Sequence, residues 1–368
     1  MHILRTTRYL ASIVAVALLA GCSAQSATPP TAGRMAGNEA TANNSSDACP
    51  CLYVANEGAG DQGSVTVYGS GATGNAAPVQ YIHGSKTKLI EAWGLAVDPE
   101  RNIYVANPGG GYKGRGSVVV FAAGADGNVA PKQIITGPAT GLLFPFWVAV
   151  SPITGEIYVE TEGSGCYIDG GICVLVFASG ANGNTSPIGA IDGPYTGLGA
   201  ISGLATDANG SIYVGNSNAG SNIKGSITVY AAGSLGNVFP TQTIAGSKTE
   251  LDAPQEIAVD HSNNIYVDNY GQSGIEGQSV TVYRAESNGN VKPMQTIAGN
   301  KTKLGVNSGI AVDNKDQIYL SGSGGDIFPN ATDWVMVYAA GAHGNVGPIY
   351  KIAGNRTKLD YANGIAIR

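Results

Sequence analysis

The chain repeats itself six times, and this periodicity restricts its possible folds more than any other feature. A tyrosine inside a short Ile-Tyr-Val-like run recurs at intervals of about 53 residues, together with a Gly-Asn-x-x-Pro element and a Thr-x-Leu element. The tyrosines are Tyr53, Tyr104, Tyr158, Tyr213, Tyr266 and Tyr319. The prolines are Pro78, Pro131, Pro187, Pro240, Pro293 and Pro348, and the threonines are Thr87, Thr140, Thr196, Thr249, Thr302 and Thr357. Three markers with one period indicate six copies of one structural unit.

Each copy contains four short runs with the composition of β-strands. In the copy that starts near Trp93 the runs are GLAVD, NIYVAN, SVVVFAAG and PKQIIT, separated by turns rich in Gly, Asn, Asp or Pro. Four antiparallel strands in a repeat of about 50 residues are the pattern of a β-propeller blade. The first run alternates small and large residues. We expect the small face to let six inner strands crowd round an axis, and the large face to pack against the next blade.

The two ends of the chain complement each other. The first copy begins at Leu52 with the second strand of a blade, and the chain finishes with NGIAIR, a first strand at residues 364–367. Pairing these two strands would complete a blade and remove exposed strand edges. The sequence therefore predicts an all-β fold: a six-bladed β-propeller of four-stranded antiparallel blades over residues 50–368, closed by the C-terminal strand.

Composition agrees with this fold and excludes some partners. The chain has 54 glycines and only 12% charged residues, which suits many short strands joined by tight turns. Its net charge is −6, and it has no cluster of Lys and Arg. We therefore expect no nucleic-acid partner and no binding of the folded body to anionic lipid head groups. No cofactor and no metal are expected, and a monomer is expected.

The N-terminus has the pattern of an export signal. Arg5 and Arg8 precede an apolar stretch at residues 10–20 that is too short to span a bilayer, and Leu-Ala-Gly-Cys ends at Cys22. Small residues before a cysteine at this point resemble the bacterial lipobox. The resemblance implies a signal peptide at 1–21 and diacylation of Cys22; the alternative is an ordinary secretory signal with a chance cysteine. Residues 22–49 are poor in large apolar residues and are interpreted as a flexible tether.

The strand pair G-[LI]-A-V-D-x(4)-[NSQ]-I-Y-V-x-N resembles the NHL-repeat propellers and the broader gluconolactonase-like six-bladed group. The resemblance covers all six repeats and implies the fold, not one activity, because these propellers include lactonases, lyases and non-catalytic binders. The second half of each repeat departs from the usual NHL ending.

The resemblance implies a site at the mouth of the central channel, where the first strands begin and the second strands end. The residue just before each inner strand is expected to form a ring of ligand-binding side chains: Trp93, Trp147, Ser202, Glu256, Ser308 and Asn363. The loops after the second strands vary most, which is typical of segments that carry specificity. These loops are residues 57–63, 108–116, 162–172, 217–225, 270–278 and 323–333.

The ring composition favours binding over catalysis. Gluconolactonase-like enzymes hold a divalent metal with Glu, Asn and Asp at such positions, but here only Glu256 and Asn363 have that chemistry. His83, His261 and His343 are expected away from the mouth, so none is placed as a general base. The two tryptophans could stack on a sugar, although plugging the channel or packing between blades is the favoured alternative.

The repeated asparagines and aspartates have a structural interpretation. The Asn that ends each YVAN-like run is expected to bond loop backbone rather than a ligand, and the Asp after each first strand is expected to form the following turn. The asparagines are Asn56, Asn107, Asn216 and Asn269, and the aspartates are Asp98, Asp207, Asp260 and Asp313.

Five cysteines are present, and lipidation of Cys22 would leave an even number in an oxidising compartment. Cys166 and Cys173 flank one second-to-third-strand loop and are expected to form a disulfide. The state of Cys49 and Cys51 is left open, because a bond between residues two apart is strained.

The sequence therefore favours an envelope protein, lipid-anchored at the periplasmic face of the outer membrane or at the cell surface. It would bind a glycan or protein through the channel-mouth face, or act as a scaffold. The alternative is a metal-assisted lactonase or lyase that uses the same channel mouth.

Overall fold

The computed structural model describes residues 51–58, 62–109, 116–163, 166, 171–217, 225–271, 277–323 and 333–368. The chain divides into two units, Met1–Ala48 and Cys49–Arg368, and all described residues belong to the second. The expected signal peptide (1–21), tether (22–49) and lipidation site Cys22 lie outside the described residues. No helix long and apolar enough to cross a membrane occurs in the part of the chain that is described.

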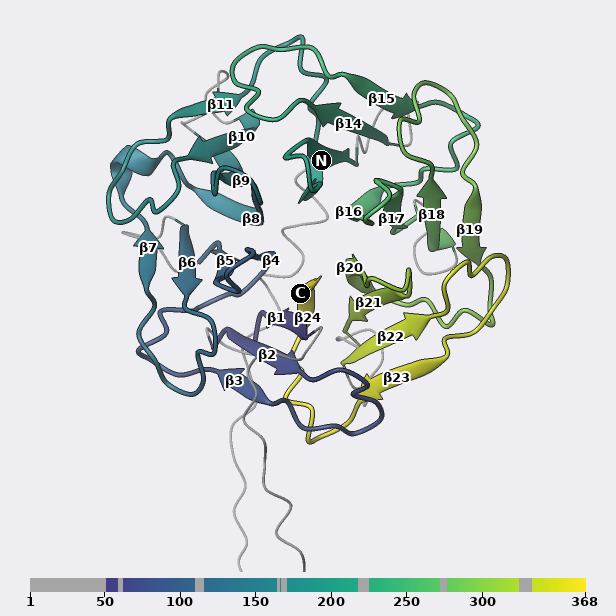
Figure 1. The fold of residues 1–368 in the computed structure, drawn as a ribbon, viewed down its shortest axis with the longest axis horizontal. Helices are drawn as coiled ribbons and strands as arrows, with labels where there is room; N and C mark the ends of the chain where they lie inside the picture. The colour runs from purple at the N-terminus through teal and green to yellow at the C-terminus, as the bar shows by residue number, and fades with distance from the viewer. Residues whose placement is uncertain are drawn as a thin grey trace, which may run out of the picture. The chain divides into compact units, whose positions relative to one another are not determined.

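The second unit is a six-bladed β-propeller in which each blade is a four-stranded antiparallel sheet (Figure 1). Blade 1 contains β24 (Ala362–Ile367), β1 (Leu52–Asn56), β2 (Ser64–Tyr68) and β3 (Gln80–Ile82). Blade 2 contains β4 (Leu95–Val97), β5 (Ile103–Asn107), β6 (Ser117–Phe121) and β7 (Gln133–Ile135). Blade 3 contains β8 (Phe144–Val150), β9 (Ile157–Gly163), β10 (Gly171–Phe177) and β11 (Gly189–Ile191).

The other three blades follow the same order from the axis outward. Blade 4 contains β12 (Ile201–Thr206), β13 (Ile212–Asn216), β14 (Ser226–Tyr230) and β15 (Gln242–Ala245). Blade 5 contains β16 (Pro254–Val259), β17 (Ile265–Asn269), β18 (Ser279–Tyr283) and β19 (Gln295–Ala298). Blade 6 contains β20 (Asn307–Val312), β21 (Ile318–Gly322), β22 (Trp334–Tyr338) and β23 (Tyr350–Ala353).

The C-terminal strand closes the ring, as the sequence predicts. β24 pairs with β1 in antiparallel register, with Tyr53 opposite Ala366 (Figure 1). Backbone hydrogen bonds between Cys51 and Arg368 extend this pairing beyond the strands (N···O 2.8 and 3.0 Å). The first and last strands of the chain are therefore neighbours in one blade.

The inner strands have one face of small residues, as expected. Their large residues pack against the preceding blade, whereas the sequence predicts packing against the next one. A Cβ atom on Gly94 would lie 2.5 Å from the carbonyl oxygen of Phe146 in blade 3, so the small face meets the following blade. Leu95 packs with Tyr53 and Ala55 of the preceding blade, not with the next one. Each hydrophobic cluster thus lies between two blades, and burying both faces of every sheet holds the ring together.

The second half of each repeat forms a clasp between neighbouring blades at the outer rim. The Gly of each Gly-Asn pair makes a parallel bridge with the fourth strand of the preceding blade, and Gly74 with Ile352 closes the ring. The Asn beside it accepts a backbone N–H from the loop that follows that strand; at the closing junction Arg356 N donates to Asn75 Oδ1 (2.8 Å). The equivalent acceptors elsewhere are Asn128, Asn184, Asn237, Asn290 and Asn345.

Closure can be tested at Ile365, which is 3% exposed and lies opposite Val54. Ile365→Ala is expected to lower the free energy of unfolding by about 2–4 kcal/mol, because it leaves a cavity between β24 and the neighbouring blade. Ile367→Ala, at a half-buried position of the same strand, is expected to cost less. Urea unfolding followed by tyrosine fluorescence measures both. An unchanged midpoint for Ile365→Ala would contradict the closed ring.

Candidate functional site

We call the edge of the ring where second strands end the loop edge, and the edge where first strands end the turn edge. The strand register shows that the six residues expected to form one ring at the loop edge occupy two neighbouring positions. Glu256 lies opposite Asp268 on the second strand, at the register where Gly203 lies opposite Gly215 and Gly309 opposite Ser321. The expected ring therefore mixes two registers.

Four of the expected residues lie one position earlier, relative to their inner strands, than Glu256 does relative to β16. Trp93, Ser202, Ser308 and Asn363 each precede the glycine of the inner strand. Blades 3 and 5 lack that glycine and have Trp147 and Glu256 at its place. The residues at the inner register are Gly94, Trp147, Gly203, Glu256, Gly309 and Gly364. Trp147 and Glu256 therefore lie one position further along their strands than the other four expected residues, because their blades lack the consensus glycine.

The tryptophans pack against protein. Trp147 is 6% exposed and lies in the apolar cluster between blades 3 and 4 with Leu204. Trp93 packs on the same cluster and makes an edge contact with the ring of Phe146, with centroids 5.2 Å apart. This is the packing between blades that the sequence favours over a ligand platform.

Glu256 is a buried carboxyl at the interface of blades 5 and 6. Its side chain is 5% exposed, and Oε2 accepts the backbone N–H of Ile310 from β20 at 2.6 Å. Gly309 leaves the space for this contact, because a Cβ there would lie 2.8 Å from Glu256 Oε2. The carboxyl therefore points away from blade 5 into the inner strand of blade 6.

Asp268 is a second buried carboxyl on the same face of blade 5. It lies opposite Glu256 in the register and is fully buried. Asn307 Nδ2 of blade 6 donates to Asp268 Oδ1 at 3.0 Å, whereas Oδ2 has no hydrogen-bond partner within the described residues. Two carboxyls thus share one interface.

Gln278 is a further buried polar residue, directly before β18. It is 4% exposed, and neither its Oε1 nor its Nε2 has a hydrogen-bond partner in the part of the chain that is described. We call Glu256, Asp268 and Asn307 the interface cluster. Of these three, only Glu256 is a site residue that the sequence analysis singled out.

Burial raises the pKa of both carboxyls. Loss of hydration is the main cause for Glu256; the hydrogen bond from Ile310 opposes it, and the charge of Asp268 adds to it. Loss of hydration raises the pKa of Asp268 to about 7, against the hydrogen bond from Asn307. Strands β16–β18 and β20–β22 contain no Lys or Arg that could compensate either charge. Burial therefore shifts both groups toward the protonated form, and Asp268 can exchange a proton near neutral pH.

The metal that the gluconolactonase resemblance implies does not fit the residues present. Glu256 Oε2 faces Ile310 N, whereas Asn363 Nδ2 donates to Glu57 Oε2 at 3.1 Å in another blade. Among the described residues, no three His, Cys, Asp or Glu side chains are grouped so that they could hold a metal ion. We derive no chemistry through a metal.

Glu160 occupies in blade 3 the place that Asp268 has in blade 5. It is fully buried, and its Oε2 accepts the backbone N–H of Phe146 at 3.1 Å. The same position of the other second strands is small or hydroxylic: Ala55, Ala106, Gly215 and Ser321. Departure from the Tyr-Val-Ala-Asn consensus is the sequence signal that could have identified both acidic residues.

The repeated asparagines bond loop backbone, as predicted. Asn107 Oδ1 accepts the N–H groups of Ile90 and Glu91 at 2.9 and 3.0 Å. Asn56, Asn216 and Asn269 each accept one N–H from the corresponding loop. These side chains fix the connections that lead into the inner strands at the loop edge.

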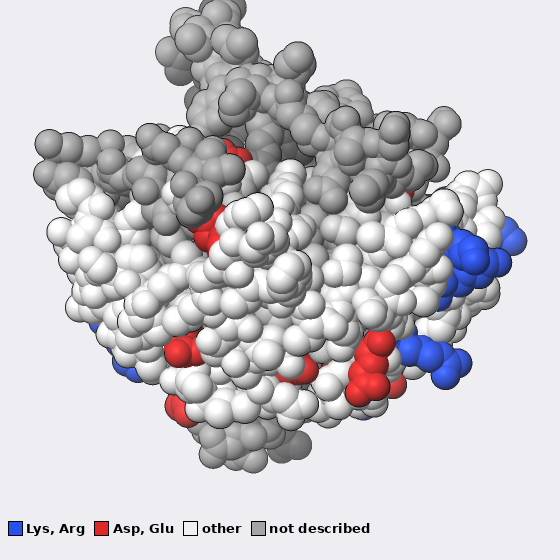
Figure 2. Space-filling view, turned by 90° about the horizontal axis from the view of Figure 1, so that it is seen from above, with Lys and Arg blue, Asp and Glu red and all other residues white. Residues whose placement is uncertain are grey.

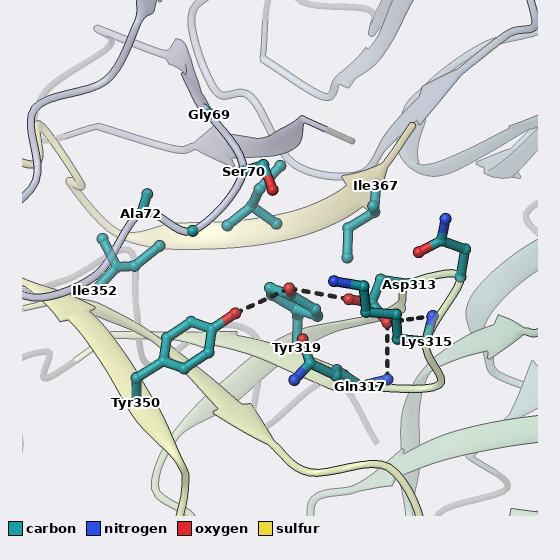
Figure 3. A pocket seen from close by; sticks show the side chains of 13 residues that line it. Gly69, Ser70, Ala72, Asp313, Lys315, Gln317, Tyr319, Tyr350, Ile352 and Ile367 are labelled. Carbon is teal, nitrogen blue, oxygen red and sulfur yellow. Dashed lines mark hydrogen bonds between the residues drawn. The ribbon is translucent and has the colours of Figure 1, made fainter. Parts of the chain in front are cut away.

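The repeated aspartates form the turns at the opposite edge. Asp98 Oδ1 accepts Asn102 N at 2.7 Å, and Asp207, Asp260 and Asp313 make the equivalent contact. A pocket of about 130 Å³ opens at the turn edge between blades 6 and 1. Figure 3 shows its polar groups engaged with one another: Tyr319 Oη donates to Asp313 Oδ2 (3.2 Å) and lies 3.0 Å from Tyr350 Oη. None of the expected ring residues lines this pocket.

Cysteine and histidine positions agree with expectation where they are described. Cys166 and Cys173 form a disulfide with Cα atoms 5.5 Å apart, bracing the connection between β9 and β10. Cys51 is buried, and Cys49 lies outside the described residues. His83 stacks on Tyr81, and His343 Nδ1 accepts Thr296 N at 3.1 Å, both at outer strands. On the side seen in Figure 2, uncharged residues cover most of the described surface.

No protein family matches the sequence, and no curated protein matches it either. Solved structures do match the fold. A chain in the crystal structure of a nidogen/laminin complex aligns over 86% of this chain and 98% of its own length. The aligned residues are 12% identical, and the TM-score is 0.56. The PQQ-bound aldose sugar dehydrogenase of Streptomyces coelicolor aligns over 84% of this chain and 90% of its own length. The aligned residues are 15% identical, and the TM-score is 0.49. At these identities the likeness concerns the fold alone.

The charge state of Asp268 can be tested by its effect on stability. Because the folded state holds the proton more tightly than the unfolded chain, stability falls as the pH rises from about 4 to about 7 and then levels off. Asp268→Asn is expected to remove this loss, so that its effect on the free energy of unfolding is more favourable at pH 8 than at pH 4 by about 3–4 kcal/mol. Chemical unfolding at both pH values measures it, with the exposed Asp126→Asn as control. An unaltered pH profile would show that Asp268 is charged throughout this range.

Proposed function

We propose that this protein is an exported, lipid-anchored β-propeller of the NHL-like kind that binds a glycan or protein at its loop edge. The anchor rests on the sequence around Cys22, where a basic start, a short apolar stretch and Leu-Ala-Gly-Cys occur together. Attached acyl chains contribute about 0.8 kcal/mol per buried CH₂, so two or more give stable anchoring. The body would act as a monomer at the outer membrane or cell surface.

One observation carries the binding proposal: the connections at the loop edge vary more between the six blades than the other parts of the repeat do. All six blades share one strand order, so the connections between second and third strands start at the same edge. These connections differ in both length and sequence. Variable segments on a rigid, repeated base are typical of recognition surfaces. The disulfide braces one of these connections, and Asn107 Nδ2 donates to Ser117 Oγ across the base of another at 3.0 Å.

A catalytic role is the second candidate, and the interface cluster is the observation in its favour. A carboxyl with a pKa near 7 suits general acid–base chemistry. Glu256 and Asp268 are, however, 5% exposed and fully buried. A substrate would reach them only if blades 5 and 6 separated locally, and this makes binding the better supported function.

The anchor predicts a specific modification. Cys22→Ser is expected to abolish incorporation of labelled palmitate and to move the protein out of the membrane fraction, because the acyl chains have no other attachment point. Cys49→Ser, which changes a nearby cysteine, should leave both labelling and fractionation intact. Continued labelling of the Cys22→Ser protein would refute the anchor.

The binding proposal predicts that recognition depends on the loop edge. Replacing residues 324–332 by a Gly–Ser linker of equal length is expected to weaken binding on a glycan array, or photo-crosslinking to envelope proteins, at least tenfold. Replacing the turn residues 314–316 at the opposite edge is the control and should change neither. Equal effects of the two replacements would place the binding surface elsewhere.

A further inference from the structure

The junction between blades 3 and 4 breaks the pattern of the outer clasp. At four junctions the residue before the Gly-Asn pair accepts a backbone N–H from the preceding blade. These acceptors are Asp126, Asn182, Asn288 and His343. Blade 4 has Leu235 at this place, 41% exposed and close to Gly189, the first residue of β11 (the junction appears between β11 and β14 in Figure 1).

Two aromatic residues replace polar or small ones at the same junction. Tyr195 stands where the other repeats have Lys86, Ala139, Lys248, Lys301 and Arg356. Phe239 stands where they have Ala77, Ala130, Ser186, Lys292 and Gly347. The two rings stack on each other with centroids 4.9 Å apart and remain 56% and 73% exposed.

We call Ile188, Tyr195, Leu235 and Phe239 the rim patch; Ile188 is 50% exposed. Single exposed apolar residues are ordinary on protein surfaces. Here, however, three positions that the repeat fills mainly with polar or small residues are apolar together at one junction of six. The fold does not require this, because the other five junctions form the same clasp with polar or small residues at the positions of Tyr195, Leu235 and Phe239. The rim patch therefore indicates a surface that something apolar covers.

We propose that the rim patch docks the propeller body on the surface of an uncharged lipid bilayer. This inference rests on the lipid anchor proposed above. From Cys22 to the first described residue the chain has 28 intervening residues. A lipid on Cys22 would keep the body close to the bilayer and so raise its effective concentration at the lipid surface, and a small apolar patch is then sufficient.

The chemistry of the rim patch fits a bilayer interface. Tyrosine and other aromatic side chains concentrate at the head-group level, where the ring is in an apolar layer and the hydroxyl stays hydrated. At Tyr195 the cationic residue of four other junctions is missing, which removes attraction to anionic lipid. The patch exposes a few hundred Å² at most, whereas a stable dimer buries roughly 800 Å² per partner. A second copy of this chain is therefore a poor occupant.

A tryptophan placed in the rim patch would report contact with lipid. The mature lipidated protein carrying Phe239→Trp is reconstituted into phosphatidylcholine vesicles with brominated acyl chains, which quench nearby indole fluorescence. Lys292→Trp, the equivalent position at the next junction, is the matched control. We expect at least twofold stronger quenching for Phe239→Trp, and no increase when phosphatidylglycerol is added. Equal quenching of the two variants overturns the proposal.

A second experiment removes the rim patch by substitutions that occur naturally at the equivalent positions of another junction. Tyr195→Lys combined with Phe239→Lys installs the side chains found at the equivalent places of the junction between blades 4 and 5, Lys248 and Lys292, so the thermal midpoint should not change. The unlipidated protein at millimolar neutral lipid should show saturable vesicle binding that this double variant loses at least tenfold. Equal binding of both proteins overturns the proposal, as does a concentration-dependent dimer that the double variant abolishes. If labelling shows that Cys22 carries no lipid, the anchor fails, while the vesicle result still decides for or against the patch.

Discussion

The inner strands approach the axis so closely that backbone meets backbone, and the rest of the molecule is arranged around this contact. Gly94 N donates to Phe146 O, and Gly364 N donates to Trp93 O, both at 2.9 Å, so neighbouring blades are hydrogen-bonded to each other at their inner ends. A side chain at these glycines would collide with the following strand. Where a large residue does occupy the register, as at Glu256, the glycine of the next blade provides the room. The burial of Glu256, and with it the raised pKa, follows from this geometry.

The fold could be predicted because its determinants are repeated and local. Strand runs, turn-forming aspartates and loop-bonding asparagines occur in most of the copies, so an error in one is corrected by the others. Closure could be predicted from the offset between Leu52 and the final strand. The direction in which the large faces of the inner strands pack could not, because alternation identifies two faces without telling which neighbour each one meets.

The candidate site was harder to predict than the fold, because the fold follows from features that repeat. Its residues are the ones that depart from the repeat. Asp268 and Glu160 look like ordinary ends of second strands, and only the strand register shows that Asp268 lies opposite Glu256. The mixture of two registers in the expected ring has the same origin, since the blades of Trp147 and Glu256 lack the glycine that marks the position.

Departures from the repeat concentrate in a few regions of the propeller, besides the variable connections. Near the axis, carboxyls and an amide replace small residues between blades 5 and 6. At the outer rim, aromatic and aliphatic side chains replace polar ones between blades 3 and 4. A ring of equivalent units offers six versions of every surface, and differences between them can arise without disturbing the closure that all six share.

The pairing of β24 with β1 also sets an order of assembly. A ribosome or export channel releases the N-terminus first, so blade 1 is begun before any other blade and finished after all of them. Until β24 emerges, β1 keeps one open edge and the apolar faces of blades 1 and 6 lack part of their cover. The nascent chain therefore cannot complete its ring blade by blade; β24 must be synthesised before the ring can close, and a chain that lacks β24 would remain an open arc.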